Sequence, residues 1–306
     1  MAIKSLLDRV RNQIKRGHSS LPLGINRKGD SHHEQYQRNA EDPLVIIDIG
    51  CRWGFADQFP LDANDLRVYG FDPDPEECAR LQELYREKPV KIFPIGLSGK
   101  PGQRTLHQTH QPACSSLIPP IERLTREYPA LNCARKVSEV KVNTTTLNAW
   151  ALSENVTWAD YLKIDTQGSE LEILKGGEAL IRSARALEIE VEFNPIYQGQ
   201  PLYSEVDLYL RSLGFVLWKF TNFVHYSKQP ELNQPQGLDI ICFDENFHNE
   251  NPLYGGQLFW ANAHFIHQSV LENSIPLQRQ RDERLFEMLR MPDVLRDRIT
   301  PPGTDP

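Results

Sequence analysis

Apolar positions occur along the chain in short runs that alternate with amphipathic segments. Residues 44–48 form a continuous apolar run ending at an aspartate, as expected for a strand that is covered on both faces. Further runs of strand length occupy residues 67–71, 90–95, 161–165, 186–193, 215–220 and Leu238–Phe243. Segments of helical character separate most of these runs. The pattern therefore predicts βαβ units, a parallel sheet and an α/β fold.

Two of the helical segments have recognisable boundaries. Asp74 is placed to be an N-cap, Pro75 follows at the first helical position, and Glu77 occupies the capping-box position. Residues 169–184 predict a helix with a glycine kink. The region from 99 to 150 is less regular. There we expect strands at 103–108 and 138–147, with a helix around Ile121–Tyr128 between them.

The pattern divides the chain into three parts. Residues 1–43 read as a basic amphipathic helix followed by a flexible lead-in, and residues 44–245 carry the α/β alternation. Residues 246–306 are an irregular C-terminal extension that contains a charged helix at Leu277–Ile299 and a Pro-rich tail. We expect this helix and the tail to be peripheral.

Composition narrows the class of protein. The 306 residues are 40% hydrophobic and 25% charged, as in ordinary globular proteins, and the net charge of −7 disfavours a nucleic-acid partner. No apolar run reaches the length of a membrane helix. The N-terminal helix predicts either a weak contact with a membrane surface or simple packing, and we favour packing. The five cysteines are odd in number and lack a C-x-x-C motif, which favours free thiols and a cytoplasmic location.

The turn after the first predicted strand reads D-I-G-C-R-W-G over residues 48–54. It lacks the middle glycine that admits a pyrophosphate, and it has no P-loop lysine. Asp72 ends the next strand, 22 positions after Gly50, close to the spacing of an acid that binds ribose. A nucleoside without a pyrophosphate points to S-adenosylmethionine, whose sulfonium cation favours nearby carboxylates such as Asp48. The alternative is that Asp48 and Asp72 only cap loops.

Longer motifs resemble a known family. Residues 162–177, "LKIDTQGSELEILKGG", and residues 190–215 are similar to the FkbM family of S-adenosylmethionine-dependent methyltransferases, and the resemblance covers roughly Leu44 to Phe243. It implies a class I methyltransferase fold, Rossmann-like, with a mostly parallel seven-stranded sheet, helices on both faces and a reversed final hairpin. It also implies methyl transfer to a hydroxyl of a sugar, glycan or secondary metabolite. Two departures stand out, the large residues within the glycine turn and Asp72 where the family usually has Glu.

We predict two sets of site residues. The cofactor-binding set is Asp48, Gly50, Cys51, Arg52, Trp53, Gly54, Asp72, Pro73, Gly96, Leu97, Ser98 and Asp165. The catalytic candidates are Asp165, Glu192 and His225. Methyl transfer to oxygen requires alignment and a base that removes the hydroxyl proton, and a carboxylate or a histidine can be that base.

Each catalytic candidate has a structural alternative. Asp165 follows a strand and is either a base or a cap for the next helix. Glu192 belongs to a row of alternate glutamates on residues 186–193, which lines either the site or a solvated face. His225 is either a base or an exposed loop residue. No spacing of ligands requires a metal ion.

Three functions stay open at this point. The first is an O-methyltransferase that acts on a small-molecule or glycan acceptor. The second is a scaffold in a biosynthetic cluster that binds the cofactor without turnover. The third is a nicotinamide-dependent oxidoreductase, which the missing glycine disfavours. The oligomeric state does not follow from the sequence.

Overall fold

The computed structural model describes residues 42–62, 65–229, 256–272 and 276–296. The basic helix and the lead-in predicted at the start of the chain fall within residues 1–41, outside the described residues. The strand predicted at Leu238–Phe243 also falls outside them.

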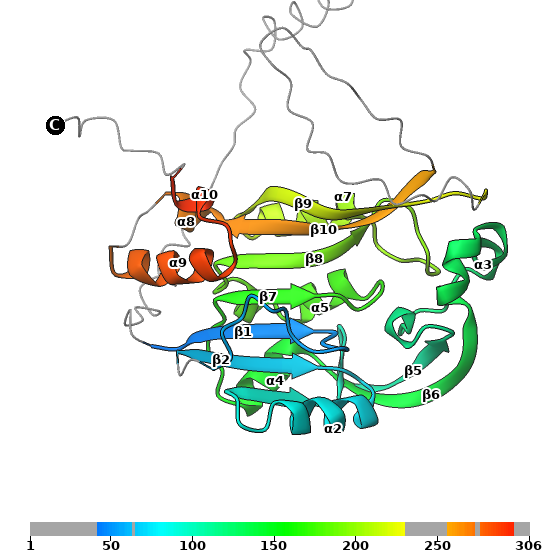
Figure 1. Ribbon diagram of the computed structural model, residues 1–306, viewed down its shortest axis with the longest axis horizontal. Coiled ribbons are helices and arrows are strands. Elements are labelled where there is room, and N and C mark those ends of the chain that lie inside the picture. The colour runs from blue at the N-terminus through cyan, green and yellow to red at the C-terminus, as the bar shows by residue number, and fades with distance from the viewer. Residues whose placement is uncertain (1–41, 63–64, 230–255, 273–275, 297–306) are drawn as a thin grey trace, which may run out of the picture. The chain divides into compact units, whose positions relative to one another are not determined.

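The apolar runs form the main sheet, whose described strands are arranged in the order β3-β2-β1-β7-β8-β10-β9 (Figure 1). These strands are β1 (Leu44–Ile49), β2 (Leu66–Phe71), β3 (Val90–Phe93), β7 (Tyr161–Ile164), β8 (Ala186–Glu192), β9 (Phe215–Tyr226) and β10 (Gln257–His267). The strands from β3 to β8 are parallel, whereas β10 is antiparallel to both β8 and β9. This order confirms the predicted class I methyltransferase fold with its reversed final hairpin.

Helices cover both faces of the main sheet. They are α2 (Pro75–Leu84), α4 (Leu147–Ser153), α5 (Glu170–Gly176), α6 (Glu178–Ile181), α7 (Tyr203–Ser212), α8 (Gln268–Leu271), α9 (Pro276–Met288) and α10 (Asp293–Arg296). Val45 and Ile47 of β1 share a hydrophobic cluster with α4, α5, α6 and α7, while Leu44 and Ile46 share another with α2, α8, α9 and α10. This arrangement explains the continuous apolar run of β1. Spanning a bilayer takes about 20 apolar residues, and no helix in the described part of the chain meets that requirement.

The predicted N-cap and first residue of α2 are confirmed, but the predicted capping box is not formed, because Glu77 accepts the N–H of Trp53 and the N–H of Asp74 donates to Asp72. The carboxylate of Asp74 accepts the backbone N–H groups of Glu76 and Glu77 at 3.0 and 3.4 Å, with Pro75 as the first residue of α2. The predicted glycine kink separates α5 from α6 at Gly177. This break lets the chain turn over the underlying side chains of α4.

Gly177→Ala is expected to lower the free energy of unfolding by about 1–3 kcal/mol. A Cβ at this position would lie 2.6 Å from Cδ2 of Leu147 and 2.9 Å from its Cβ, and Leu147 is fully buried. Urea denaturation measures the change. Gly99→Ala is the matched control, because its added Cβ would meet Glu172 at an ordinary 3.4 Å. Equal stability of the two variants would contradict the close packing at Gly177.

A smaller sheet lies between β3 and β7 in the sequence. It consists of β4 (Gly96–Leu97), β6 (Lys136–Thr145) and β5 (Gly102–Thr109), in that order across the sheet. Three short helices connect β5 to β6, namely η2 (Pro112–Cys114), α3 (Glu122–Glu127) and η3 (Pro129–Ala134). In Figure 1 the arrowheads of β1 and β2 point toward β5 and β6. The smaller sheet therefore lies at the carboxyl ends of the main strands.

Strand β10 and helix α9 belong to the core, which corrects the prediction that the C-terminal charged helix is peripheral; the Pro-rich tail lies outside the described residues. β10 lies between β8 and β9, with Phe259, Ala261, Ala263 and Phe265 buried in alternation. Helix α9 buries Leu285, Phe286 and even Arg281, which is 1% exposed. The high charge of this helix predicted a solvated surface. An arginine is rarely buried unless another residue pairs with it, and the sequence does not show such a distant partner.

Candidate active site

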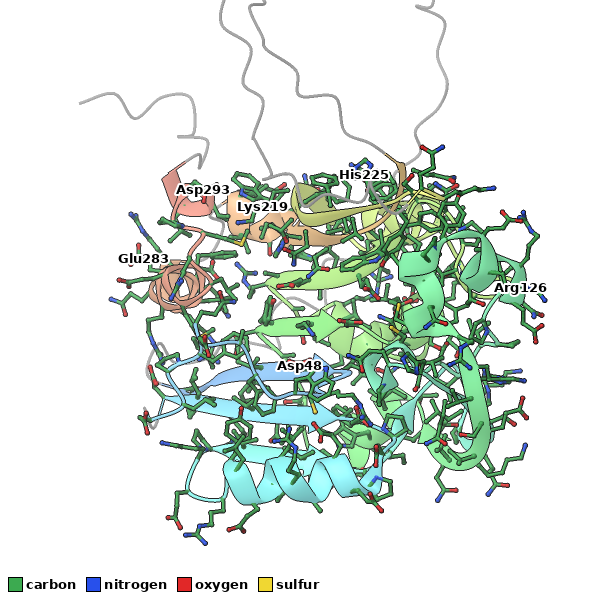
Figure 2. The ribbon with its side chains drawn as sticks, turned by 45° about the vertical axis from the view of Figure 1, so that its right-hand side comes forward. Asp48, Arg126, Lys219, His225, Glu283 and Asp293 are labelled. Carbon is green, nitrogen blue, oxygen red and sulfur yellow. The ribbon has the colours of Figure 1, made fainter. Side chains whose placement is uncertain are left out.

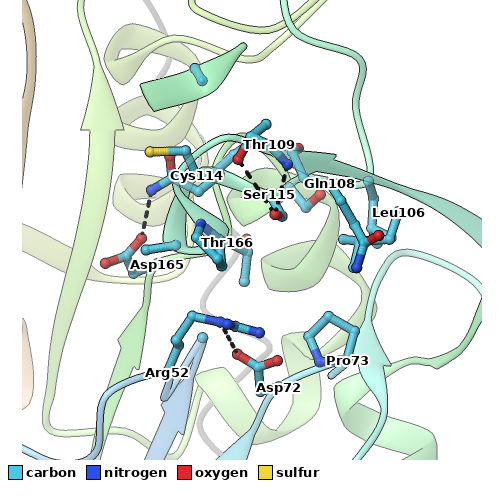
Figure 3. Close-up of a pocket in the computed structure, with 18 of the residues that line it drawn as sticks. Arg52, Asp72, Pro73, Leu106, Gln108, Thr109, Cys114, Ser115, Asp165 and Thr166 are labelled. Atoms are coloured by element: carbon cyan, nitrogen blue, oxygen red, sulfur yellow. Dashed lines mark hydrogen bonds and ion pairs between the residues drawn. The ribbon is translucent and has the colours of Figure 1, made fainter. Parts of the chain in front are cut away.

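A cavity of about 650 Å³ lies at the carboxyl ends of β1, β2 and β7, next to the smaller sheet. Strand order reverses between β1 and β7, and open α/β sheets bind ligands at such a switch point. Figure 3 shows its two walls. The main sheet and its loops contribute Arg52, Asp72, Pro73, Asp165 and Thr166, while the segment around β5 and η2 contributes Leu106, Gln108, Thr109, Cys114 and Ser115.

The turn after β1 brings backbone to the cavity. Gly50 has a φ of +89°, and a Cβ at this position would lie 1.9 Å from the carbonyl oxygen of Asp165, so only glycine fits. The N–H groups of Gly50 and Cys51 both donate to the carbonyl of Phe71, at 2.9 and 3.0 Å. The turn is therefore fixed between the ends of β2 and β7, which explains why the first strand must end at a glycine.

Asp72 lines the cavity beside this turn. Its Oδ1 accepts the N–H of Asp74 at 2.8 Å, and its Oδ2 lies 3.5 Å from Nε of Arg52. Nη2 of Arg52 also donates to Oδ2 of Asp74 at 2.5 Å. Burial raises the pKa of Asp72, although the N–H of Asp74 and the Arg52 guanidinium favour the charged form. Arg52 thus ties the glycine turn to the carboxylate that ends β2.

Trp53 lies at the rim of the same cavity. Its side chain is 63% exposed, and its backbone has a φ of 77°, a left-handed conformation that is unusual for a bulky residue. The backbone N–H donates to Oε1 of Glu77 at 3.1 Å. The indole therefore borders the opening and leaves the interior to other side chains.

Four of the residues predicted to bind the cofactor do not line the cavity. Asp48, Cys51 and Ser98 are buried behind its wall, and Gly54 also lies outside the lining. The other eight predicted residues do line it: Gly50, Arg52, Trp53, Asp72, Pro73, Gly96, Leu97 and Asp165. The strand ends were predicted correctly from the sequence, but the pattern does not show which side chains at those ends point into the cavity.

Lys163 lies between two carboxylates of the site, the buried Asp48 and the partly exposed Asp165. Its Nζ lies 3.5 Å from Oδ1 of Asp48 and 3.8 Å from Oδ2 of Asp165. Burial raises the pKa of Asp48 to about 6. Burial alone would lower the pKa of Lys163, but the attraction of Asp48 and Asp165 outweighs it and the pKa is raised. The ammonium therefore stays charged and holds Asp165 in position.

Asp165 faces the cavity in a network that the sequence analysis missed. Nε2 of Gln167 donates to Oδ1 of Asp165 at 2.9 Å and to Oε2 of Glu190 at 2.5 Å, and Oε1 of Gln167 accepts the hydroxyl of Tyr197 at 3.0 Å. Gln167 has a left-handed φ of 59°, and such strain often marks a functional site. No side chain caps the N-terminus of α5, so Asp165 is not the helix cap that was its alternative.

Glu190 is the second carboxylate of this network. Burial raises its pKa well above the usual range, and the nearby carboxylates of Asp165, Glu192 and Glu170 raise it further. Burial therefore favours the protonated form of this carboxyl group. The row of alternate glutamates on β8 was a usable signal, but the sequence favoured Glu192 because it is nearer the end of the strand.

Two predicted catalytic residues do not line the cavity. Glu192 is 2% exposed, and β10 pairs with it through Trp260, so the end of β8 is covered. His225 lies within β9 opposite Leu258, because β9 continues to Tyr226 instead of ending at Phe220. Figure 2 shows His225 on this edge strand of the main sheet. Of the three candidates, the structure brings Asp165 alone to the cavity.

Comparisons with known proteins found similar sequences and structures. The chain is 26% identical over 183 residues to the 2-O-methyltransferase NoeI of Sinorhizobium fredii (strain NBRC 101917 / NGR234), covering 58% of this chain and 75% of that protein. The magnesium protoporphyrin IX methyltransferase ChlM of Synechocystis PCC 6803, solved with bound SAM, matches with 12% identity and a TM-score of 0.35, over 77% of this chain and 73% of that one. A TM-score this low supports no assignment, so the fold class rests on the strand order.

The family model of the methyltransferase FkbM domain matches residues 48–217 of the sequence, which is more than half of the chain. The matched stretch begins at Asp48 and includes the glycine turn, the smaller sheet, Asp165 and Glu190. S-adenosylmethionine is the cofactor of this class of enzyme. The chain belongs to the FkbM family of S-adenosylmethionine-dependent methyltransferases.

Proposed function

We propose that this enzyme methylates a hydroxyl oxygen of a sugar, glycan or secondary metabolite. The observation that carries the proposal is the position of Asp165, a carboxylate on the cavity wall that is held by Lys163 and Gln167 beside the glycine turn. The name of the relative NoeI, a 2-O-methyltransferase, supports oxygen as the acceptor atom.

The residues at the main-sheet end of the cavity fit S-adenosylmethionine. Gly50 lines the cavity with its backbone, and Asp72 presents a carboxylate that can accept hydrogen bonds from ribose hydroxyls. Pro73, Gly96 and Leu97 line the cavity beside them. When bound, the cofactor supplies a methyl group activated by a sulfonium cation. The nearby carboxylates of Asp72 and Asp165 favour that positive charge.

The other end of the cavity suits an acceptor with hydroxyl groups. Tyr197, Tyr226 and Trp260 line it together with Glu190. Aromatic faces provide apolar area, and hydroxyl, indole and carboxyl groups provide hydrogen bonds. Burial favours the protonated form of Glu190, which can donate a hydrogen bond to an acceptor oxygen, while Asp165 can take the proton of the reacting hydroxyl. Holding these groups in place contributes the alignment on which a displacement reaction depends.

Methyl transfer to a panel of acceptors tests the proposal. The full-length protein is incubated with radiolabelled S-adenosylmethionine and with monosaccharides, oligosaccharides or hydroxylated natural products, and the product is analysed by NMR. We expect an O-methyl product from at least one acceptor class. Binding of S-adenosylhomocysteine without transfer to any acceptor would instead support a non-catalytic scaffold, and transfer to nitrogen would contradict the assignment of oxygen.

Asp72→Ala is expected to weaken the binding of S-adenosylhomocysteine by about 10- to 100-fold. A hydrogen bond to a charged group contributes about 1.5–3 kcal/mol, and 1.4 kcal/mol corresponds to a factor of ten. Isothermal titration calorimetry measures the affinity. Glu76→Ala is the control, because it removes a carboxylate from the exposed first turn of α2, outside the cavity. An unchanged affinity in Asp72→Ala would exclude this residue as the ribose ligand.

The cellular setting is also part of the proposal. We expect the enzyme to act in the cytoplasm on acceptors other than nucleic acids. The net charge of −7 disfavours binding to a phosphate backbone. The cysteines within the described residues, Cys51, Cys78, Cys114 and Cys133, are all free thiols, as is usual in a reducing compartment.

A further inference from the structure

Two cysteines from different segments meet in the wall of the cavity. Cys114 ends η2, and Cys133 lies in η3, 19 positions later. Both are half-buried and both line the cavity, where their thiol groups interact with each other. A backbone hydrogen bond also holds the two segments together, because the N–H of Gln111, just before η2, donates to the carbonyl of Cys133 in η3 at 2.9 Å.

The two sulfur atoms have different environments. The thiol of Cys114 donates to the sulfur of Cys133, and this hydrogen bond, with the N–H groups of Ala134 and of Cys133 itself, lowers the pKa of Cys133 to about 7. The same hydrogen bond raises the pKa of Cys114, and so do burial and the carboxyl groups of Glu190 and Asp165. At neutral pH a thiolate therefore forms at Cys133 more readily than at Cys114.

The other two described cysteines, Cys51 and Cys78, differ from this pair in burial and in thiol pKa. Cys51 and Cys78 are buried, and burial raises the pKa of both thiols, that of Cys78 to about 12. Neither lines the cavity. A thiol reagent or an oxidant should therefore distinguish the pair in the wall from these two residues.

We propose that Cys133 and Cys114 form an oxidisable dithiol in the cavity wall, a modification site that regulates access of the acceptor. The oxidant is a hydroperoxide. The Cys133 thiolate attacks the terminal oxygen and breaks the O–O bond, giving a sulfenic acid and, for hydrogen peroxide, water after proton uptake. The sulfur of Cys114 then attacks the sulfenic sulfur, a disulfide forms, and a second water leaves with the proton of Cys114. In total, two thiols lose two hydrogen atoms and the peroxide becomes two molecules of water.

Oxidation of this pair should affect the active site, because the segment that carries Cys114 contacts residues of the cavity wall. The carbonyl of Cys114 accepts the hydroxyl of Tyr197 at 2.7 Å, and Oγ of Ser116 donates to the carbonyl of Gln167 at 2.7 Å. A disulfide, with its S–S bond of about 2.05 Å, would tie η2 covalently to η3 and restrain both segments. This restraint acts on the segment that contacts Tyr197 and Gln167, whereas Arg52 and Asp72 lie on the other wall of the cavity (Figure 3). Oxidation should therefore reduce methyl transfer more than cofactor binding.

Peptide mapping after oxidation tests the proposal directly. The full-length protein, in a Cys242→Ser background, is treated with hydrogen peroxide, and its peptides are analysed by mass spectrometry with and without dithiothreitol. We expect a disulfide between Cys114 and Cys133 that dithiothreitol reverses, while Cys51 and Cys78 stay reduced. In Cys114→Ser, a sulfenic acid at Cys133 should accumulate and react with dimedone. Absence of the linkage, or equal oxidation of Cys51 and Cys78, would overturn the proposal.

The pH dependence of alkylation gives a second test that does not require oxidation. The rate of reaction of Cys133 with iodoacetamide should rise with a midpoint at about pH 7. Cys114→Ala removes the donor and should move the midpoint upward, whereas Cys114→Ser keeps a donor and should move it less. Cys78→Ala is the control and should leave it unchanged. A midpoint that is the same in Cys114→Ala as in the unmodified chain would contradict the coupling of the two thiols.

Discussion

Arg281→Ala is expected to lower the free energy of unfolding by about 3–5 kcal/mol, the cost of breaking a buried ion pair by removal of one partner. Nε and Nη2 of Arg281 donate to the two carboxylate oxygens of Asp160 at 2.8 and 2.6 Å, and both side chains are almost fully buried. The guanidinium also donates to the carbonyls of Asp42 and Pro43, each at 2.7 Å. Its removal leaves the Asp160 carboxylate buried without its cation.

The same helix offers a matched control. Arg279 pairs with Glu283 at 2.9 Å, but their side chains are 59% and 47% exposed. Exposed pairs of this spacing contribute about 0.3–0.5 kcal/mol, so Arg279→Ala should change stability little. Urea denaturation followed by circular dichroism measures both variants. If Arg281→Ala were as stable as Arg279→Ala, α9 would not be anchored to the start of β7 through this pair.

Asp165→Asn is expected to reduce kcat by about 100- to 10,000-fold, the usual contribution of a positioned general base. Asparagine keeps the shape of the side chain and can still accept the hydrogen bond from Gln167, but it cannot take up the proton of a hydroxyl. The affinity for S-adenosylhomocysteine should change little, because cofactor recognition is assigned chiefly to Gly50 and Asp72. Single-turnover rates at saturating cofactor and acceptor separate this effect from binding.

His225→Ala is the comparison variant for Asp165→Asn. His225 was a candidate base from the sequence, but it lies on the edge strand β9 and does not line the cavity. We expect its loss to leave the single-turnover rate intact. A rate that survives in Asp165→Asn and falls in His225→Ala would reverse the assignment of the base.

Much of the fold could be predicted because its signals are local. The apolar run of β1, the cap at Asp74 and the break at Gly177 each depend on neighbours a few residues away. Burial of α9 could not be predicted, because the partner of Arg281 is Asp160, 121 positions earlier in the chain. The long β9 also escaped prediction, since it is stabilised by pairing with the distant strand β10.

The site could be predicted to the level of strand ends and no further. Gly50, Asp72 and Asp165 follow their strands, and parallel topology brings these ends together. Which glutamate of β8 reaches the cavity depends on how β10 and the following loop cover the strand, so Glu190 was passed over for Glu192. Gln167 gave no signal, because its role depends on a left-handed backbone and on two carboxylates from different strands.

A crystal structure of the enzyme with S-adenosylhomocysteine would test the central claim most directly, namely that the cofactor occupies the cavity between the glycine turn and Asp72. The predicted complex has the ribose hydroxyls within hydrogen-bond distance of Asp72 and the amino-acid part of the ligand near the backbone of Gly50 and Asp165. A ligand bound outside this cavity, or one whose ribose makes no contact with Asp72, would contradict it.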